Sequence, residues 1–244
     1  MTLLLSGKTK RTVTHRDFYG PPVERMPFLV SGKDERGKVF NVPCVPASFA
    51  YIIKQRETAS EDFRRAWQMN IYSTGDAVSL GVDGDIVSTW DSPILRTVTP
   101  ESTLVDGALK LSTAQWNELR AQKDGTLYLS AEQVAETHGK GYVKKNGVWT
   151  PENTSVAKVW EHLSRGRDLE RYAEMVADAT PGIERILRVY FDQSRLSSPT
   201  LLSWVAHRID NSSLACGDFS LEYVGGRLVG VAPEAHEKAL EVRV

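Results

Sequence analysis

Cysteine is scarce in this sequence, and long apolar runs are missing. The 244 residues include two cysteines, Cys44 and Cys216, and no C-x-x-C pair, and the five histidines are scattered along the chain. A structural zinc site needs about four clustered nitrogen or sulfur ligands, so neither a metal site nor another cofactor is expected. A membrane-spanning helix needs roughly 18 consecutive apolar residues, which the sequence does not contain. These features favour a cytoplasmic protein, in a reducing compartment and without membrane contact.

The motifs of nucleotide hydrolysis and of covalent catalysis are incomplete. Ser6-Gly7-Lys8-Thr9 matches the end of a phosphate-binding loop, but the first glycine of that motif would fall at Thr2, where no strand can precede it. No G-x-S-x-G elbow is present for a serine enzyme. Catalytic residues therefore stay unknown, and the sequence favours a protein that is not an enzyme.

Charge is distributed unevenly along a chain of ordinary composition. Hydrophobic residues make up 41% and charged residues 25%, as in a globular domain. Residues 1–65 carry twelve Lys/Arg and seven Asp/Glu, whereas residues 66–110 carry two and six. A local excess of cations of this kind is one mark of a surface that binds polyanions.

The first 110 residues read as β-rich. "MPFLVSG" (26–32) and "KVFNVPCV" (38–45) are strand-like runs. "AVSLGVDGDIVSTW" (77–90) predicts a hairpin with a turn at Asp83-Gly84, because both residues tolerate positive φ. Between these segments, residues 46–67 are compatible with helix.

The middle of the chain mixes short elements with strong local signals. Ser112 with Gln115, and Ser130 with Gln133, form the pattern of a capping box at the start of a helix. A short strand, "TLYLS", lies between the two helices, and "YVKKNGVW" (142–149) predicts a hairpin on an Asn-Gly turn.

Four segments of residues 152–210 have apolar residues at helical spacing i, i+3, i+4, i+7. They begin at Val156, Leu169, Ile183 and Leu202. A hairpin on Gly225-Gly226 and a short polar helix are expected to follow. The sequence thus predicts an α+β fold, with a β-rich part (1–110), a helix-hairpin insert (111–150), and a part with about four amphipathic helices and a terminal hairpin (151–244).

One segment resembles a known family. In residues 24–57, a strand-like run and a turn lead into Val42-Pro43-Cys44-Val45-Pro46-Ala47-Ser48 and then into a helix that ends with Lys54 and Arg56. This arrangement is similar to the RAMP-superfamily backbone subunits of CRISPR RNA-guided complexes, except that Ala47 stands where the family has glycine. The resemblance implies a ferredoxin-like core, RNA held along its backbone, and packing against other subunits or copies of itself.

The basic residues of the N-terminal part are the predicted binding site. Aromatic side chains are interleaved with them, and single-stranded nucleic acid favours that mixture because cations neutralise phosphates while rings stack on bases. The predicted nucleic-acid-binding residues are Lys8, Lys10, Arg11, Arg16, Lys54, Arg56, Arg64 and Arg65. The leading hypothesis is a non-catalytic, antiviral-defence subunit of a ribonucleoprotein assembly that binds single-stranded RNA.

Two alternatives stay open. Asp83, Asp85 and Asp91, with Asp76 nearby, suggest a metal-dependent nuclease or hydrolase, because hard divalent cations are bound by gathered carboxylates. The face shared by the four predicted helices suggests instead a protein–protein interaction module.

Overall fold

The computed structural model describes residues 15–34, 36–39, 44–192 and 197–240, with side chains up to residue 237. Helices and strands are interleaved along the whole chain, which confirms the α+β class. Within the described residues, no helix combines the length and the apolarity that crossing a membrane requires.

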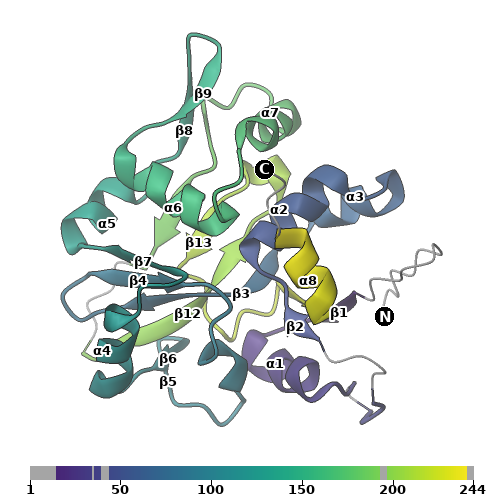
Figure 1. Cartoon of the computed structure of the whole chain (residues 1–244), viewed down its shortest axis with the longest axis vertical. Coiled ribbons are helices and arrows are strands. Elements are labelled where there is room, and N and C mark those ends of the chain that lie inside the picture. The colour runs from purple at the N-terminus through teal and green to yellow at the C-terminus, as the bar shows by residue number, and fades with distance from the viewer. Residues whose placement is uncertain (1–14, 35, 40–43, 193–196, 241–244) are drawn as a thin grey trace.

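A mixed sheet runs through the middle of the molecule (Figure 1). Its main path is β1 (Arg16–Tyr19), β14 (Arg227–Val231), β3 (Tyr72–Leu80), β12 (Thr200–Ala206), β13 (Ala215–Gly217) and β11 (Val189–Phe191). Neighbours are antiparallel except for the parallel pairs β14–β3 and β11–β13. The first and last described strands, β1 and β14, therefore lie side by side at one end of this path.

Shorter strands extend this sheet at its edges. β4 (Ile86–Thr89) pairs with β3 and with β7 (Thr126–Leu129), and β2 (Val45–Pro46) pairs with β14. β5 (Leu104–Val105) and β6 (Ala108–Lys110) form a hairpin that joins β12.

The helices surround the sheet. They are α1 (Pro22–Ser31), α2 (Phe49–Thr58), α3 (Glu61–Met69), α4 (Thr113–Ala121), α5 (Ala131–Thr137), α6 (Thr154–Ser164), α7 (Glu170–Ala179) and α8 (Pro233–Leu240). α2 packs against α3, α6, α7 and α8. Two short 3₁₀ helices span Leu95–Thr97 and Ile209–Asn211.

A second, smaller sheet stands apart from the first. β8 (Tyr142–Lys145) pairs with β9 (Val148–Pro151) and with β10 (Arg185–Ile186). Figure 1 shows the β8–β9 hairpin projecting from the body of the molecule beside α7. This sheet forms one wall of the candidate site described below.

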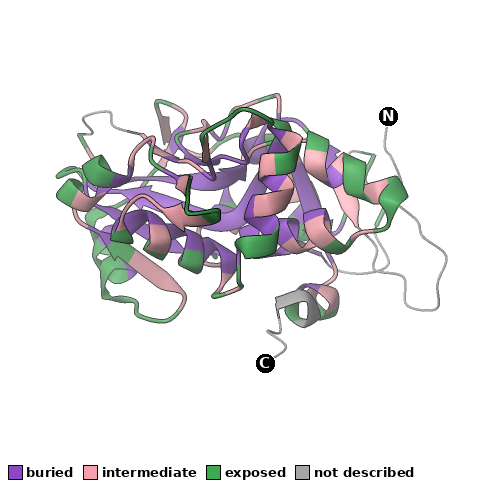
Figure 2. Ribbon diagram, turned by 90° about the horizontal axis from the view of Figure 1, so that it is seen from above, coloured by how far each residue is buried: buried purple, intermediate pink, exposed green. Residues whose placement is uncertain are grey.

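One continuous apolar core joins the sheet to its helices. The largest side chains with essentially no exposure include Trp67, Trp160 and Trp204, which come from α3, α6 and β12. Figure 2 shows the buried residues concentrated in the strands at the centre and the exposed ones on the outer helices and loops.

Several predicted elements are confirmed. The 77–90 hairpin is β3–β4, and the Asn-Gly hairpin is β8–β9. Both capping boxes are present, at the starts of α4 and α5. Helices are found within 46–67, and α6 and α7 correspond to the first two predicted helices of the C-terminal part.

Other predicted elements are wrong. "MPFLVSG" is not a strand but belongs to α1, which starts at the prolines Pro21 and Pro22 and ends at Gly32 with φ of 66°. The third and fourth predicted helices are β10–β11 and β12. β12 is buried along its whole length, so apolar residues occur on both of its faces and also match helical spacing. The predicted terminal hairpin on Gly225-Gly226 is a single strand, β14, preceded by turns.

Candidate functional site

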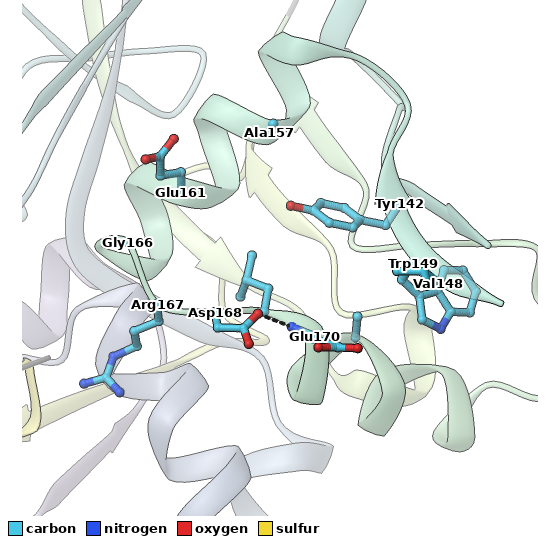
Figure 3. Close-up of a pocket in the computed structure, with 11 residues that line it drawn as sticks. Tyr142, Val148, Trp149, Ala157, Glu161, Gly166, Arg167, Asp168 and Glu170 are labelled. Carbon is cyan, nitrogen blue, oxygen red and sulfur yellow. Dashed lines mark hydrogen bonds between the residues drawn. The ribbon is translucent and has the colours of Figure 1, made fainter. Parts of the chain in front are cut away.

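Three consecutive segments of the chain enclose a cavity of about 460 Å³ at the side of the molecule (Figure 3). We call it the hairpin pocket. It is lined by Tyr142, Val148 and Trp149 of the β8–β9 hairpin, by Ala157 and Glu161 of α6, and by residues 166–170 and Ala173. Its walls thus combine a hairpin, the second half of α6 and the start of α7.

The geometry of the hairpin presents two aromatic rings to this pocket. Asn146 and Gly147 have φ of 52° and 84°, the conformation of a tight two-residue turn. That turn pairs Lys144 with Trp149 and places Tyr142 two residues before Lys144 on the same strand. Since cross-strand partners and alternate residues share a face, Tyr142 and Trp149 project from the same side. Figure 3 shows the Tyr142 ring extending from the hairpin toward α6.

Ionic contacts hold the hairpin in place. The Gly141 N–H donates to Glu152 Oε2 over 2.8 Å, and Arg185 Nε on β10 lies 2.6 Å from the same oxygen. Burial alone would raise the pKa of Glu152, but these two partners lower it below its ordinary value. Lys144 Nζ lies 3.5 Å from Glu174 Oε1 on α7. The pocket is therefore braced on both sides.

The pocket carries an excess of negative charge. Glu161, Asp168 and Glu170 line it, together with one cation, Arg167. Figure 3 shows the Arg167 side chain directed away from Tyr142 and Trp149. The pKa of Tyr142 is raised, first by burial and then by the charge of Glu161. Acidic side chains therefore outnumber basic ones in the lining of the pocket.

A second cavity of about 400 Å³ adjoins the first and shares Glu161 and Gly166 with it. We call it the Trp90 pocket. The Trp90 and His162 rings stack at 5.1 Å between centroids, and the Arg165 guanidinium lies 5.0 Å from the Trp90 ring. Burial, helped by the charge of Arg165, lowers the pKa of His162 to about 3, so this histidine is neutral. The two pockets lie next to each other around the end of α6, and we refer to them together as the groove.

A buried carboxylate fixes the inner side of this groove. Asp76 on β3 has no exposed surface and accepts hydrogen bonds from the Phe49 N–H at 2.7 Å and the Asp91 N–H at 3.0 Å. Arg165 reaches Asp76 at 3.4 Å and Asp91 at 2.8 Å. Burial raises the pKa of Asp76 to about 6 despite Arg165. These contacts hold Arg165, and with it the Trp90 pocket, against the sheet.

Ser48, His236 and Asp91 resemble a catalytic triad in composition but not in geometry. His236 Nε2 lies 3.0 Å from Ser48 Oγ, and the same nitrogen accepts the Ser48 N–H at 3.1 Å and lies 3.9 Å from Asp91 Oδ1. A proton relay needs the serine and the carboxylate on different ring nitrogens. Ser48 also has no exposed surface and caps α2 by accepting from the Tyr51 N–H. The group therefore fastens α8 to α2.

The structure places the described basic residues predicted to bind nucleic acid on three elements. Lys8, Lys10 and Arg11 lie outside the described residues, Arg16 is on β1, Lys54 and Arg56 are on α2, and Arg64 and Arg65 are on α3. Arg56 is fully buried and donates to Trp67 O, Tyr172 Oη and His207 O. It therefore belongs to the interior and to no surface.

The three aspartates of the nuclease alternative have different surroundings. Asp85 lies 3.7 Å from Arg120, Asp91 is paired with Arg165, and Asp83 is exposed in the β3–β4 turn. Across the part of the chain that the structure describes, no group of three or more His, Cys, Asp or Glu side chains is placed to hold a metal ion.

Comparison with known proteins identifies the fold. No protein-family model matches the sequence, and no curated protein matches it. A solved structure matches over 91% of this chain and 99% of its own, with a TM-score of 0.59 and 10% sequence identity. The words that describe this structure are "Accommodation of massive sequence variation in Nanoarchaeota by the C-type lectin fold".

This likeness overturns the predicted family and function. The described part of residues 24–57 belongs to α1, β2 and α2 of a fold that matches the solved structure, so the resemblance to RAMP-superfamily CRISPR subunits is wrong. The prediction of an RNA-binding ribonucleoprotein subunit, which was drawn from the N-terminal basic residues and from that resemblance, is wrong as well. The chain has a C-type lectin-like fold.

Proposed function

We propose that this chain is a binding protein that recognises a partner polypeptide along the groove formed by the hairpin pocket and the Trp90 pocket. The observation that supports this most directly is the β8–β9 hairpin, which holds two aromatic rings over a cavity beside an exposed Val148. Interfaces are enriched in aromatic side chains of this kind, and a few of them supply most of the binding energy.

The shape and the chemistry of the groove favour a polypeptide. Two adjoining cavities of about 460 and 400 Å³ offer separate places for successive side chains of one extended polypeptide. Its walls alternate aromatic, aliphatic and charged side chains. The one triad-like group of the described residues is closed to solvent at Ser48 and has no relay geometry. A recognition role therefore explains the groove better than covalent catalysis does.

The fold supports the same proposal. The similar structure from Nanoarchaeota is described as accommodating massive sequence variation. A scaffold whose core tolerates changing surface residues is suited to recognition, because affinity is set by a small number of surface side chains.

The proposal is tested by selecting binders from a displayed library of random peptides on the purified protein. The selected peptides are then measured on Trp149→Ala and Tyr142→Ala and on the control Tyr128→Ala, which removes an exposed ring of β7 that does not line the groove. We expect each groove variant to lose about tenfold or more in affinity, as for interface aromatic anchors, and the control to bind like wild type.

Thermal unfolding of each variant checks that the fold is retained. Peptides that bind all three variants equally would place recognition elsewhere on the molecule and overturn the proposal.

A further inference from the structure

The hairpin pocket is lined by more carboxylates than cations. Glu161 and Glu170 form no ion pair with any residue that the structure describes, and Asp168 Oδ1 accepts only the Glu170 N–H at 2.9 Å. Arg167 is the one cation among the described residues of the lining, and its charge, after that of Arg171, also lowers the pKa of Glu57 on α2, partly offsetting the effect of burial. Three carboxylates therefore share the pocket with a single cation.

The aromatic walls of the pocket are suited to a cation as well. The face of an aromatic ring attracts a positive charge within about 6 Å of its centroid. Trp149 already receives one such contact, because Lys144 Nζ lies 5.6 Å from its ring while it is paired with Glu174. Val148 and Leu169 provide apolar surface on which the methylene stem of a long side chain packs.

We propose that the hairpin pocket receives a cationic side chain, arginine or lysine, of the partner polypeptide. In this arrangement the stem packs on Tyr142 and Trp149, and the charged head pairs with Glu161 and with the carboxylates at the start of α7. A neutral side chain would leave the carboxylates without a partner, and an acidic one would be repelled. This inference rests on the proposed function, because it names the chemistry of the partner at the same groove.

The experiment follows the indole N–H signal of Trp149 by NMR, assigned by its loss in Trp149→Phe. The probes are the peptide acetyl-Gly-Gly-Arg-Gly-Gly-amide and its counterpart with citrulline, which has nearly the same shape without the charge. The arginine peptide should shift the signal saturably, and the citrulline peptide should bind at least about fivefold more weakly.

A matched pair of variants assigns the effect to the pocket. Glu161→Gln removes one carboxylate of the pocket, whereas Glu222→Gln removes an exposed carboxylate outside it. Glu161→Gln should weaken the arginine peptide about fivefold, and Glu222→Gln should leave it unchanged.

Equal shifts with arginine and citrulline, or no shift with arginine, would overturn the inference. Library peptides that bind at the groove without a basic residue would overturn it too, while leaving the proposed function in place. If the proposed function itself is wrong, the result differs: the library peptides would bind Trp149→Ala and Tyr142→Ala as tightly as they bind the wild-type protein.

Discussion

Arg56 lies in the interior, and among the described residues its guanidinium has no carboxylate partner. Its guanidinium donates to Trp67 O at 3.0 Å, Tyr172 Oη at 2.8 Å and His207 O at 2.7 Å, and it also reaches Ser213 Oγ at 3.1 Å. These acceptors belong to α3, to α7 and to the segment between β12 and β13. One side chain thus joins polar groups of three segments in the interior.

Removal of Arg56 should destabilise the protein strongly. In Arg56→Ala the acceptors stay buried and lose their donor, so the free energy of unfolding should fall by about 3 kcal/mol. Arg64→Ala is the matched control, because Arg64 is exposed and donates only to Ala59 O. Urea denaturation should show little change for it, and an Arg56→Ala protein as stable as Arg64→Ala would contradict this account.

The position of Arg56 could not be predicted from the sequence. A basic residue near the end of a helix is usually exposed, and nothing local to residues 49–58 indicates that α3, α7 and the 207–213 loop close over it. Burial of a charge depends on the acceptors that surround it, and these lie between 11 and 157 residues away along the chain.

At the scale of elements, predictions succeeded where the signal was local. The capping boxes at Ser112 and Ser130 and the Asn146-Gly147 turn satisfy their own hydrogen bonds or dihedral angles within four residues, so sequence alone identifies them. The helix predicted at β12 was wrong because the conformation of this segment is set by β3, which is distant in sequence and pairs with it. Pairing partners override the helical spacing of a buried run.

The β8–β9 hairpin gives a second prediction at this scale. A Cβ added at Gly141 would lie 2.3 Å from Ile186 O, a backbone atom of β10 that cannot move without breaking the small sheet. Gly141→Ala should therefore cost about 1–3 kcal/mol, and hydrogen exchange at the β8 amides should accelerate. At Gly226 an added Cβ meets Ser73 Oγ at an ordinary 3.5 Å, so Gly226→Ala is the control.

Unchanged exchange in Gly141→Ala would show that β8 and β10 tolerate the added methyl group. If exchange accelerates as expected, peptide binding at the hairpin pocket should weaken in parallel, because the pocket loses the support of β10.

At the scale of the whole molecule, the groove arises from packing rather than from any one motif. The hairpin at 142–149 and helices near 156–163 and 169–176 are each indicated by sequence. Their arrangement around a cavity is not, because it depends on the contacts of Glu152, Glu174 and Asp76 with residues of other elements. The sequence therefore predicted the elements that line the site but not the cavity between them.

Buried histidines give the whole fold a defined response to acid. Burial lowers the pKa of His15 and His236 to about 4 and that of His162 to about 3. The unfolded chain takes up these protons first as the pH falls below about 6.5, so the stabilisation is complete above that value and is lost toward the lower pKa. Asp76, with a pKa raised to about 6, acts in the opposite direction, as do Asp17, Glu57 and Asp218, whose pKa values burial also raises, so the net response is smaller than the histidines alone would give.

His162 allows this response to be tested at one position. His162→Phe keeps an aromatic ring stacked on Trp90 and removes the group that must stay neutral in the folded state. Between pH 7 and pH 5 the wild-type protein should lose about 2 kcal/mol more of its free energy of unfolding than the variant, since roughly 1.4 kcal/mol corresponds to each unit below 6.5. Urea denaturation of both proteins at the two pH values measures the difference. An equal loss in both would mean that His162 takes up its proton without unfolding the protein, and that the Trp90 pocket admits water to the ring.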